Sequence, residues 1–167
     1  MKIGVVSDTH IHGDKELDTF KEIFSKHFSH VDLVFHAGDL VNIRVFEWLN
    51  EQVETVAVSG NMDFPEVCEI LPRIRIVEAG EFRIGLTHGQ GPPSGLVERI
   101  KMGFEDMEKE SELDCIVYGH THWTVNRVVN GTLFFNPGTP TDTKFAPYNS
   151  IGFLEINDKI EGTIKRI

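Results

Sequence analysis

The stretch KIGVVSDTHIHGD, residues 2–14, places a short apolar run directly before a group of histidine and acidic side chains. The run IGVV is rich in valine and isoleucine, which favours a buried β-strand. The polar side chains follow where that strand ends. Two metal-binding patterns are present, because His10 forms an H-x-H pair with His12 and a D-x-H pair with Asp8.

Four further apolar runs end in similar polar clusters. VDLVF is followed by HAGD, TVAV by SGNMD, RIGL by THG and CIVY by GHTH. These runs predict buried strands at Val31–Phe35, Val56–Val58, Ile84–Leu86 and Ile116–Tyr118. Ligands of open α/β sheets collect at the carboxyl ends of the strands, so we expect all five clusters to converge on one site.

The remaining pattern predicts a single α/β domain over residues 1–167. Helical spacing joins Leu17, Phe20, Phe24 and Phe28, and again Val97, Ile100, Phe104 and Met107 after a capping Ser94. Alternating strands and helices imply parallel pairing with helices outside. Towards the C-terminus, WTVNRVV-NG-TLFFN predicts a hairpin with a type I′ turn, and two more strands are expected at 150–156 and 161–166.

Composition excludes several classes of protein. The chain has 167 residues, of which 40% are apolar, and a formal charge of -10, which disfavours binding to long nucleic acid. Neither a membrane-length apolar segment nor a signal-peptide pattern is present, so we expect a cytoplasmic protein without a membrane partner. Cys68 and Cys115 form no C-x-x-C pair and are expected to be reduced, mostly buried thiols. A homo-oligomer is compatible with the sequence.

The chain resembles the calcineurin-like metallophosphoesterase superfamily, because it carries the motifs of that superfamily in the same order: D-x-H, G-D, G-N, H and G-H-x-H. The H-x-H families, metallo-β-lactamases and amidohydrolases, do not account for the later motifs, so His10 and not His12 is the expected ligand. The resemblance implies a two-sheet αββα sandwich with a binuclear metal site at the strand carboxyl ends. It also implies the ligands: Asp8, His10 and His122 for one ion, Asn61, His88 and His120 for the other, and Asp39 bridging both.

Carboxylate, imidazole and amide ligands suit borderline first-row ions. We therefore expect two divalent ions, with manganese first and nickel, iron, cobalt or zinc as alternatives. A hydroxide bridging the ions would attack a small phosphoester substrate, and Asp39 would be the catalytic residue that positions it.

Position 62 departs from the larger family members, which carry a histidine after the G-N asparagine. A methionine thioether cannot donate a proton, and the phosphate-gripping Asp-Arg-Gly of protein phosphatases is also missing. The chain therefore most resembles small phosphodiesterases acting on small or nucleotide-like diesters. The alternatives are a phosphomonoesterase and a non-catalytic protein-binding scaffold resembling the small retromer subunit.

The expected substrate contacts are Asn61, Met62, His36 and Gly138. Gly138 lies in a segment that resembles the N-P-G-[ST] turn of the family, and a plain β-turn is the alternative interpretation of this segment. Asp63 is a candidate for orienting the ligands, and the alternative interpretation is an exposed turn residue.

Overall fold

Two five-stranded sheets form the centre of the computed structural model, which describes residues 1–105, 112–142 and 144–167. The first sheet, in the order β10-β9-β1-β2-β3, contains β1 (Lys2–Val6), β2 (Leu33–His36), β3 (Thr55–Ala57), β9 (Ser150–Ile156) and β10 (Ile160–Arg166). The second, in the order β4-β5-β6-β8-β7, contains β4 (Ile74–Ala79), β5 (Phe82–Thr87), β6 (Cys115–Val117), β7 (Val125–Val129) and β8 (Thr132–Asn136). The described helices are α1 (Asp14–His27), α2 (Arg44–Gln52), α3 (Pro65–Ile70) and α4 (Leu96–Glu105).

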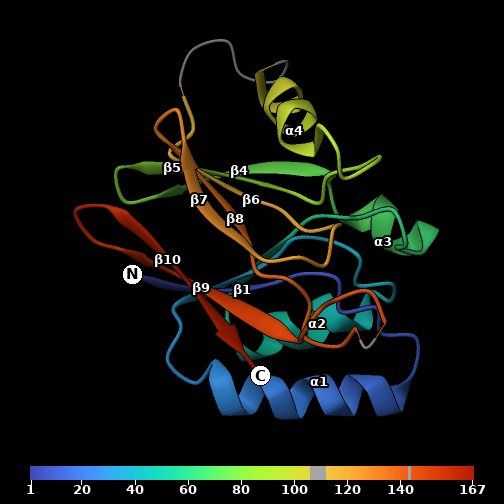
Figure 1. Ribbon diagram of the computed structural model, residues 1–167. Coiled ribbons are helices and arrows are strands. Elements are labelled where there is room, and N and C mark those ends of the chain that lie inside the picture. Colours follow the sequence, from blue (N-terminus) through green and yellow to red (C-terminus); the bar gives the residue numbers. More distant parts are fainter. Residues whose placement is uncertain (106–111, 143) are drawn as a thin grey trace.

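The layers stack as helix, sheet, sheet, helix (Figure 1). Helices α1 and α2 cover the outer face of the first sheet, where Phe24 packs edge-on against Trp48 at 5.3 Å between ring centroids. Side chains including Phe35 and Phe135 fill the space between the sheets. Helix α4 covers the second sheet through Phe104 and its neighbours. The predicted αββα sandwich is therefore confirmed.

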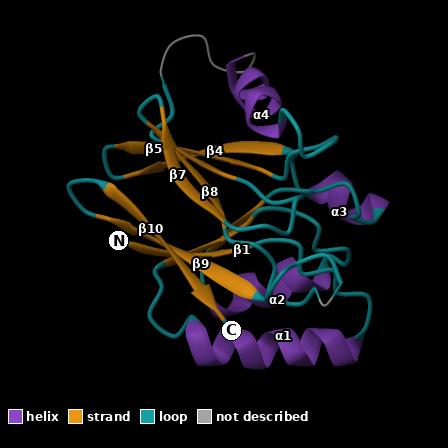
Figure 2. Ribbon diagram, viewed as in Figure 1, coloured by secondary structure: helices purple, strands orange, loops and turns teal. Residues whose placement is uncertain are grey.

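Parallel pairing brings the polar clusters to one edge of the molecule. Strand β2 pairs in parallel with both β1 and β3, and β6 pairs in parallel with both β5 and β8. Figure 2 shows the loops and α3 gathered at the edge opposite the N-terminus. In the hairpin, Asn130 and Gly131 both have positive φ, as a type I′ turn requires, so that prediction is confirmed.

Some elements differ from the prediction. Sequence reasoning did not identify β4, an edge strand of mixed exposure that carries Arg75 and Glu78, because its charges obscure the apolar pattern. The short helices α2 and α3 were also not predicted. Helix α4 begins at Leu96, two residues after Ser94, so Ser94 is not its capping residue. Met107, the last residue of the predicted helical pattern, lies outside the described residues.

Packing between the two sheets leads to a stability prediction at Gly152, in β9. A Cβ atom there would lie 2.7 Å from Cζ of the buried Phe135 ring and 3.1 Å from Pro137. We expect Gly152→Ala to lower the free energy of unfolding by about 1–3 kcal/mol through overpacking. Gly103→Ala in α4 is the control. A Cβ atom there would contact only Ile74 Cδ1, at 3.7 Å, so the substitution should stabilise the helix by about 0.5–1 kcal/mol. Urea unfolding measures both, and equal effects would contradict the packing argument.

Candidate metal centre

Five of the seven expected metal ligands have a left-handed backbone. The φ angles are 55° at Asp8, 45° at His10, 56° at Asp39, 72° at His120 and 59° at His122. Left-handed φ is uncommon outside glycine and costs about 1–3 kcal/mol per residue, and such strain clusters at functional sites. It turns the chain sharply after β1, β2 and β6, so that side chains from different strands face the same space.

Each of the two buried aspartates uses one carboxylate oxygen for bonds within the protein. Asp8 Oδ2 accepts hydrogen bonds from Ser7 Oγ at 2.6 Å and from the His120 N–H at 3.1 Å. Asp39 Oδ1 accepts one from the Met62 N–H at 2.7 Å. The other oxygens, Asp8 Oδ1 and Asp39 Oδ2, face the histidines. The carboxylates are thus oriented with one oxygen each directed into the site.

Three histidines are oriented in the same way, each by an oxygen near one ring nitrogen. Nδ1 of His88 lies 2.7 Å from the Ala37 carbonyl, Nε2 of His120 lies 2.7 Å from the Gly91 carbonyl, and Nδ1 of His122 lies 2.5 Å from Asp142 Oδ2. A ring nitrogen that donates to oxygen leaves the other nitrogen with a lone pair, which is the usual arrangement in metal-binding histidines.

The free ligand atoms converge. Nε2 of His10 and Nε2 of His122 are 3.2 Å apart, and His122 Nε2 is 3.3 Å from Asp8 Oδ1. Nε2 of His88 is 3.2 Å from Asp39 Oδ2. Ligands of one ion at about 2.0–2.2 Å from it have such separations. The ligand atoms form two groups, and within each group all atoms lie within 4.8 Å of one another. The first group is Asp8, His10 and His122, and the second is Asp8, Asp39 and His88, so Asp8 is common to both.

A divalent cation fits this donor set for a further reason. Asp8 Oδ1 and His88 Nε2 are buried, and neither makes a hydrogen bond of acceptable geometry with a described residue, although His122 Nε2 lies 3.3 Å from the first and Asp39 Oδ2 lies 3.2 Å from the second. Leaving such groups unpaired in the interior is costly, and most buried polar atoms are satisfied. An ion between them would coordinate both atoms and neutralise the buried carboxylates. The orphaned atoms therefore support metal binding independently of any sequence motif.

Charge coupling shifts the pKa values of the site in opposing directions. Burial lowers the pKa of His10, and it lowers the pKa of His36 to about 3. Burial would also lower the pKa of His122, but Asp8 and Asp142 raise it to about 9. Likewise, Asp39 and Asp8 raise the pKa of His88 against burial. The aspartates thus favour positive charge at His88 and His122, whereas burial outweighs them at His10.

Asp63 holds the loops after β2 and β3 together, as expected for an orienting residue. Its carboxylate accepts hydrogen bonds from the N–H groups of Asp39 at 3.2 Å, Val41 at 2.5 Å and Gly60 at 2.6 Å. Val41 is β-branched and has φ of 72°, a strained conformation that needs such support. The alternative interpretation as an exposed turn residue is therefore wrong.

Sequence reasoning missed Asp142. Its carboxylate contacts His122 Nδ1 and also accepts hydrogen bonds from the N–H groups of Lys144, Phe145 and Ala146. Burial opposes ionisation, but these donors and His122 lower the pKa of Asp142 to about 2. Asp142 lies twenty residues beyond its histidine in an irregular loop, and no motif pattern signals the pairing.

The N-P-G-T loop lies behind the ligands and supports them. Asn136 Nδ2 donates to the Gly119 carbonyl at 2.8 Å, and Thr139 Oγ1 donates to the Asp8 carbonyl at 2.8 Å. The Gly138 N–H, expected to contact substrate, donates to Asn136 Oδ1 at 2.9 Å, so this donor is already engaged. The loop connects the two ligand-bearing segments after β1 and β6.

The other expected site residues are distributed around this centre. The His120 ring lies 5.2 Å from the His88 ring, but His120 is in neither of the two groups of ligand atoms. Asn61 and Met62 are exposed beside His88 and Asp39, and His36 is fully buried against Thr9 Oγ1 at 3.1 Å. His12 is exposed and outside both groups, as expected. The ligand roles of Asn61 and His120 stay predictions.

A strand-end centre of carboxylates and imidazoles on an αββα sandwich defines the class of metal-dependent phosphoesterases. The model of the calcineurin-like phosphoesterase superfamily domain matches residues 1–159, and the chain belongs to this superfamily. The probable metallophosphoesterase MJ0623 of Methanocaldococcus jannaschii is 36% identical over 98% of this chain and 80% of the relative.

Two solved structures share the whole fold. One, described as a novel archaeal phosphodiesterase, has a TM-score of 0.72 and 29% identity and covers 100% of both chains. The other, Vacuolar Protein Sorting 29 from Cryptosporidium parvum, has a TM-score of 0.71 and 25% identity and covers 99% of this chain and 97% of that one. In the described part of the chain, no helix has both the length and the apolar character needed to cross a membrane.

The Asp142–His122 pair leads to a prediction for metal affinity. In Asp142→Asn, an amide N–H₂ can face His122 Nδ1 and favour the tautomer whose Nε2 is protonated. We expect manganese to bind about 10- to 100-fold more weakly, as for other outer partners of metal-binding histidines. Titration calorimetry measures the change, with the exposed Asp158→Asn as control. Unchanged affinity in Asp142→Asn would show that Asp142 only shapes its loop.

Proposed function

We propose that the chain is a phosphodiesterase that hydrolyses small or nucleotide-like phosphodiesters with two divalent metal ions, manganese being the first expectation. The observation that carries this proposal is a pair of buried ligand atoms, Asp8 Oδ1 and His88 Nε2, which make no hydrogen bond with a described residue and lie among further carboxylate and imidazole ligands at the strand ends. Membership of the superfamily supports a phosphoester substrate. The archaeal phosphodiesterase of the same fold supports the diester class.

When bound, two such ions would polarise the phosphoryl oxygens and activate a water for attack on phosphorus. The residues of the chain would hold the ions and fix their spacing. The bridging role proposed for Asp39 is supported by Asp39 Oδ2, which lies 3.9 Å from His10 Nε2 and 3.2 Å from His88 Nε2. Asp8 Oδ1 lies 3.9 Å from both of these nitrogen atoms and is common to both groups of ligand atoms, so Asp8 is the alternative bridge. The Met62 N–H on Asp39 Oδ1 keeps this carboxylate from turning away.

The preference for diesters rests on position 62. The Met62 side chain is 53% exposed beside the Asp39 loop, where the larger family members carry histidine. A thioether cannot protonate the oxygen of the leaving group. It also carries no positive charge that could stabilise the second negative charge of a phosphomonoester. A phosphodiester carries one negative charge fewer than a monoester. A diester with a good leaving group also needs no proton donor for the departing oxygen. Position 62 therefore favours activated diesters over monoesters.

A non-catalytic protein-binding scaffold remains the alternative, and the likeness to Vacuolar Protein Sorting 29 motivates it. A scaffold does not require oriented, unpaired ligand atoms in its interior. Here Asp8, Asp39 and their histidines keep both the ligand types and the partners that orient them. These oriented ligands therefore favour the enzyme.

Asp39→Asn tests the proposed bridging role. Replacing one carboxylate oxygen with an amide nitrogen removes the shared ligand, so we expect bound manganese to fall below two ions per chain. Hydrolysis of bis(p-nitrophenyl) phosphate should fall by about 10²-fold or more, comparable to the loss of one group that stabilises a transition state. Metal analysis and kinetics measure the two effects, and circular dichroism checks the fold.

His12→Ala is the matched control, because His12 is exposed and outside both groups of ligand atoms. It should keep most of the turnover. Equal losses in the two variants at unchanged thermal stability would instead favour an H-x-H metal site. Wild-type protein that saturates at one ion per chain would contradict the binuclear proposal.

Met62→His tests the explanation of diester preference. An imidazole next to Asn61 would supply a general acid, and a well-placed one accelerates a reaction by about 10²- to 10⁴-fold. The largest gain is expected for monoesters and for diesters with poor leaving groups. The measurements are the dependence of rate on leaving-group pKa and the ratio of diester to monoester turnover.

Metal content must be measured in the same preparations, since an added histidine can also bind metal. If Met62→His binds two ions but changes neither the leaving-group dependence nor the diester-to-monoester ratio, position 62 does not face the substrate. The account of diester preference would then be wrong.

A further inference from the structure

A cavity of about 370 Å³ opens beside the metal centre, on the side of His88. Asn61 and His88 line it together with side chains that belong to neither ligand group, among them Arg73, Arg99 and Cys68. Its volume falls within the range of small-molecule sites, and its position next to two expected ligands makes it continuous with the reaction centre.

The backbone of Arg73 is anchored between two ligand-bearing loops. The Ser59 N–H, in the loop after β3, donates to the Pro72 carbonyl at 2.9 Å. Thr87 Oγ1, directly before His88, donates to the Arg73 carbonyl at 3.2 Å. Arg73 is therefore held at a defined place beside both loops. Its side chain is exposed and has no hydrogen-bond or ion-pair partner in the described part of the chain.

The other charged groups of the cavity are already engaged. Arg99 of α4 donates from Nε to the Gln90 carbonyl at 3.2 Å and from Nη1 to the Ser94 carbonyl at 2.9 Å, and Nη2 contacts the Pro92 carbonyl. Arg99 thereby holds the loop that forms one wall. The Asp63 carboxylate is occupied by three backbone N–H groups, and burial raises its pKa.

Among the described residues that line the cavity, Arg73 is thus the charged side chain that has no partner, in a chain whose formal charge is -10. Guanidinium groups bind phosphate and carboxylate through paired hydrogen bonds, so an unpaired one next to a phosphoester site points to an anionic ligand group. Ile74 and Ile100 add an apolar wall on which the adjoining part of such a ligand can pack.

We propose that this cavity is the subsite for one ester arm of the substrate, and that Arg73 binds a second anionic group, such as another phosphate, on that arm. The inference rests on the proposed phosphodiesterase function and narrows its substrate class. Preferred substrates are phosphodiesters in which one arm is itself anionic. Arg73 would be a specificity-determining residue, distant from the bond that is broken.

Two matched substrates test the proposal kinetically. They are the p-nitrophenyl ester of thymidine 5′-phosphate and the same ester with an added 3′-phosphate, assayed with the manganese-loaded protein. The wild type should have the higher kcat/KM for the second. In Arg73→Gln, the ratio of the two kcat/KM values should fall about 10- to 100-fold. This fall corresponds to the free energy that hydrogen bonds to a charged group contribute to binding.

The control variant is Arg75→Gln, which removes an exposed arginine two residues away that does not line the cavity. It should leave the ratio unchanged. Equal changes in both variants, or a wild-type ratio near one, would overturn the proposal. A fall in the ratio that comes from KM and not from kcat would locate the effect in binding of the arm.

Labelling of Cys68 gives a readout that needs no turnover. Cys68 is exposed and lines the cavity, so the expectation of a buried thiol is wrong for this residue. Cys115 is buried, as expected, which raises the pKa of its thiol. Thymidine 3′,5′-bisphosphate should slow the modification of Cys68 by N-ethylmaleimide in the wild type and in Arg75→Gln, but not in Arg73→Gln. Thymidine 5′-monophosphate should protect less. Intact-protein mass spectrometry follows the reaction.

The two readouts separate the possible failures. Protection that depends on Arg73 without any diester hydrolysis would retain the anion subsite and overturn the proposed enzyme. Hydrolysis without selectivity for the anionic arm, and without protection of Cys68, would retain the enzyme and overturn the subsite.

Discussion

The metal centre depends on a sharp left-handed turn of the backbone after the strands. In the segments after β1 and β6 the same alternation recurs, with positive φ at Asp8 and His10 and again at His120 and His122. Extended backbone would carry these side chains onward along the strand direction. The left-handed residues instead bring them back across the sheet edge, where Asp39 and His88 arrive from the neighbouring strands.

Close backbone approach is the second part of this constraint. A Cβ atom at Gly119 would collide with Ser7 Oγ and would lie 2.6 Å from Asp8 Oδ2. At Gly60 it would collide with the Asp39 carboxylate. Glycine at these positions lets the loops approach the aspartates, and the strained residues are then fixed by hydrogen bonds. Asp63 holds Val41 and Asp39, and Thr139 holds the Asp8 carbonyl, so strain at the ligands is balanced by bonds behind them.

Much of this arrangement follows from local sequence. Buried strands are short apolar runs, and parallel order puts their polar ends on one edge, so the α/β class and the clustering of Asp8, His10, Asp39, His88 and His122 are predictable. The division into two sheets was predicted only through the resemblance to the superfamily. Asp142 is different, because its contact with His122 depends on the path of an irregular loop. Strand β4 was missed because its exposed edge carries Arg75 and Glu78, and pairing with β5 rather than its own pattern makes it a strand.

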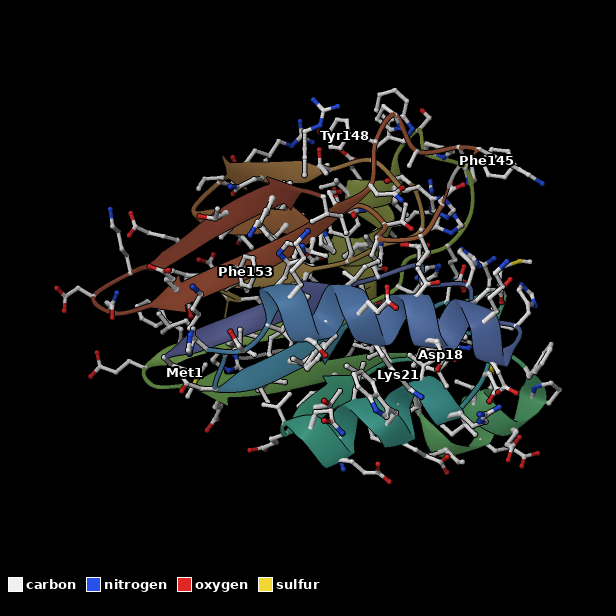
Figure 3. All side chains as sticks on the ribbon, turned by 90° about the horizontal axis from the view of Figure 1, so that it is seen from below. Met1, Asp18, Lys21, Phe145, Tyr148 and Phe153 are labelled. Carbon is white, nitrogen blue, oxygen red and sulfur yellow. The ribbon has the colours of Figure 1, made fainter. Side chains whose placement is uncertain are left out.

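The surroundings of the centre are asymmetric, and this asymmetry follows from the two sheets. On the His122 side, the Phe145 ring lies 6.3 Å from the imidazole and is 73% exposed, and Figure 3 shows Phe145 at the end of the molecule remote from Met1. On the His88 side, the cavity with Arg73 lies between the first-sheet loop after β3 and α4, which covers the second sheet. An aromatic surface and a cationic cavity therefore flank the same ligands. Under the proposed phosphodiesterase function, a substrate with one anionic arm would bind such a site in one orientation, because exchanging the arms would place an anion on the aromatic ring and leave Arg73 unpaired.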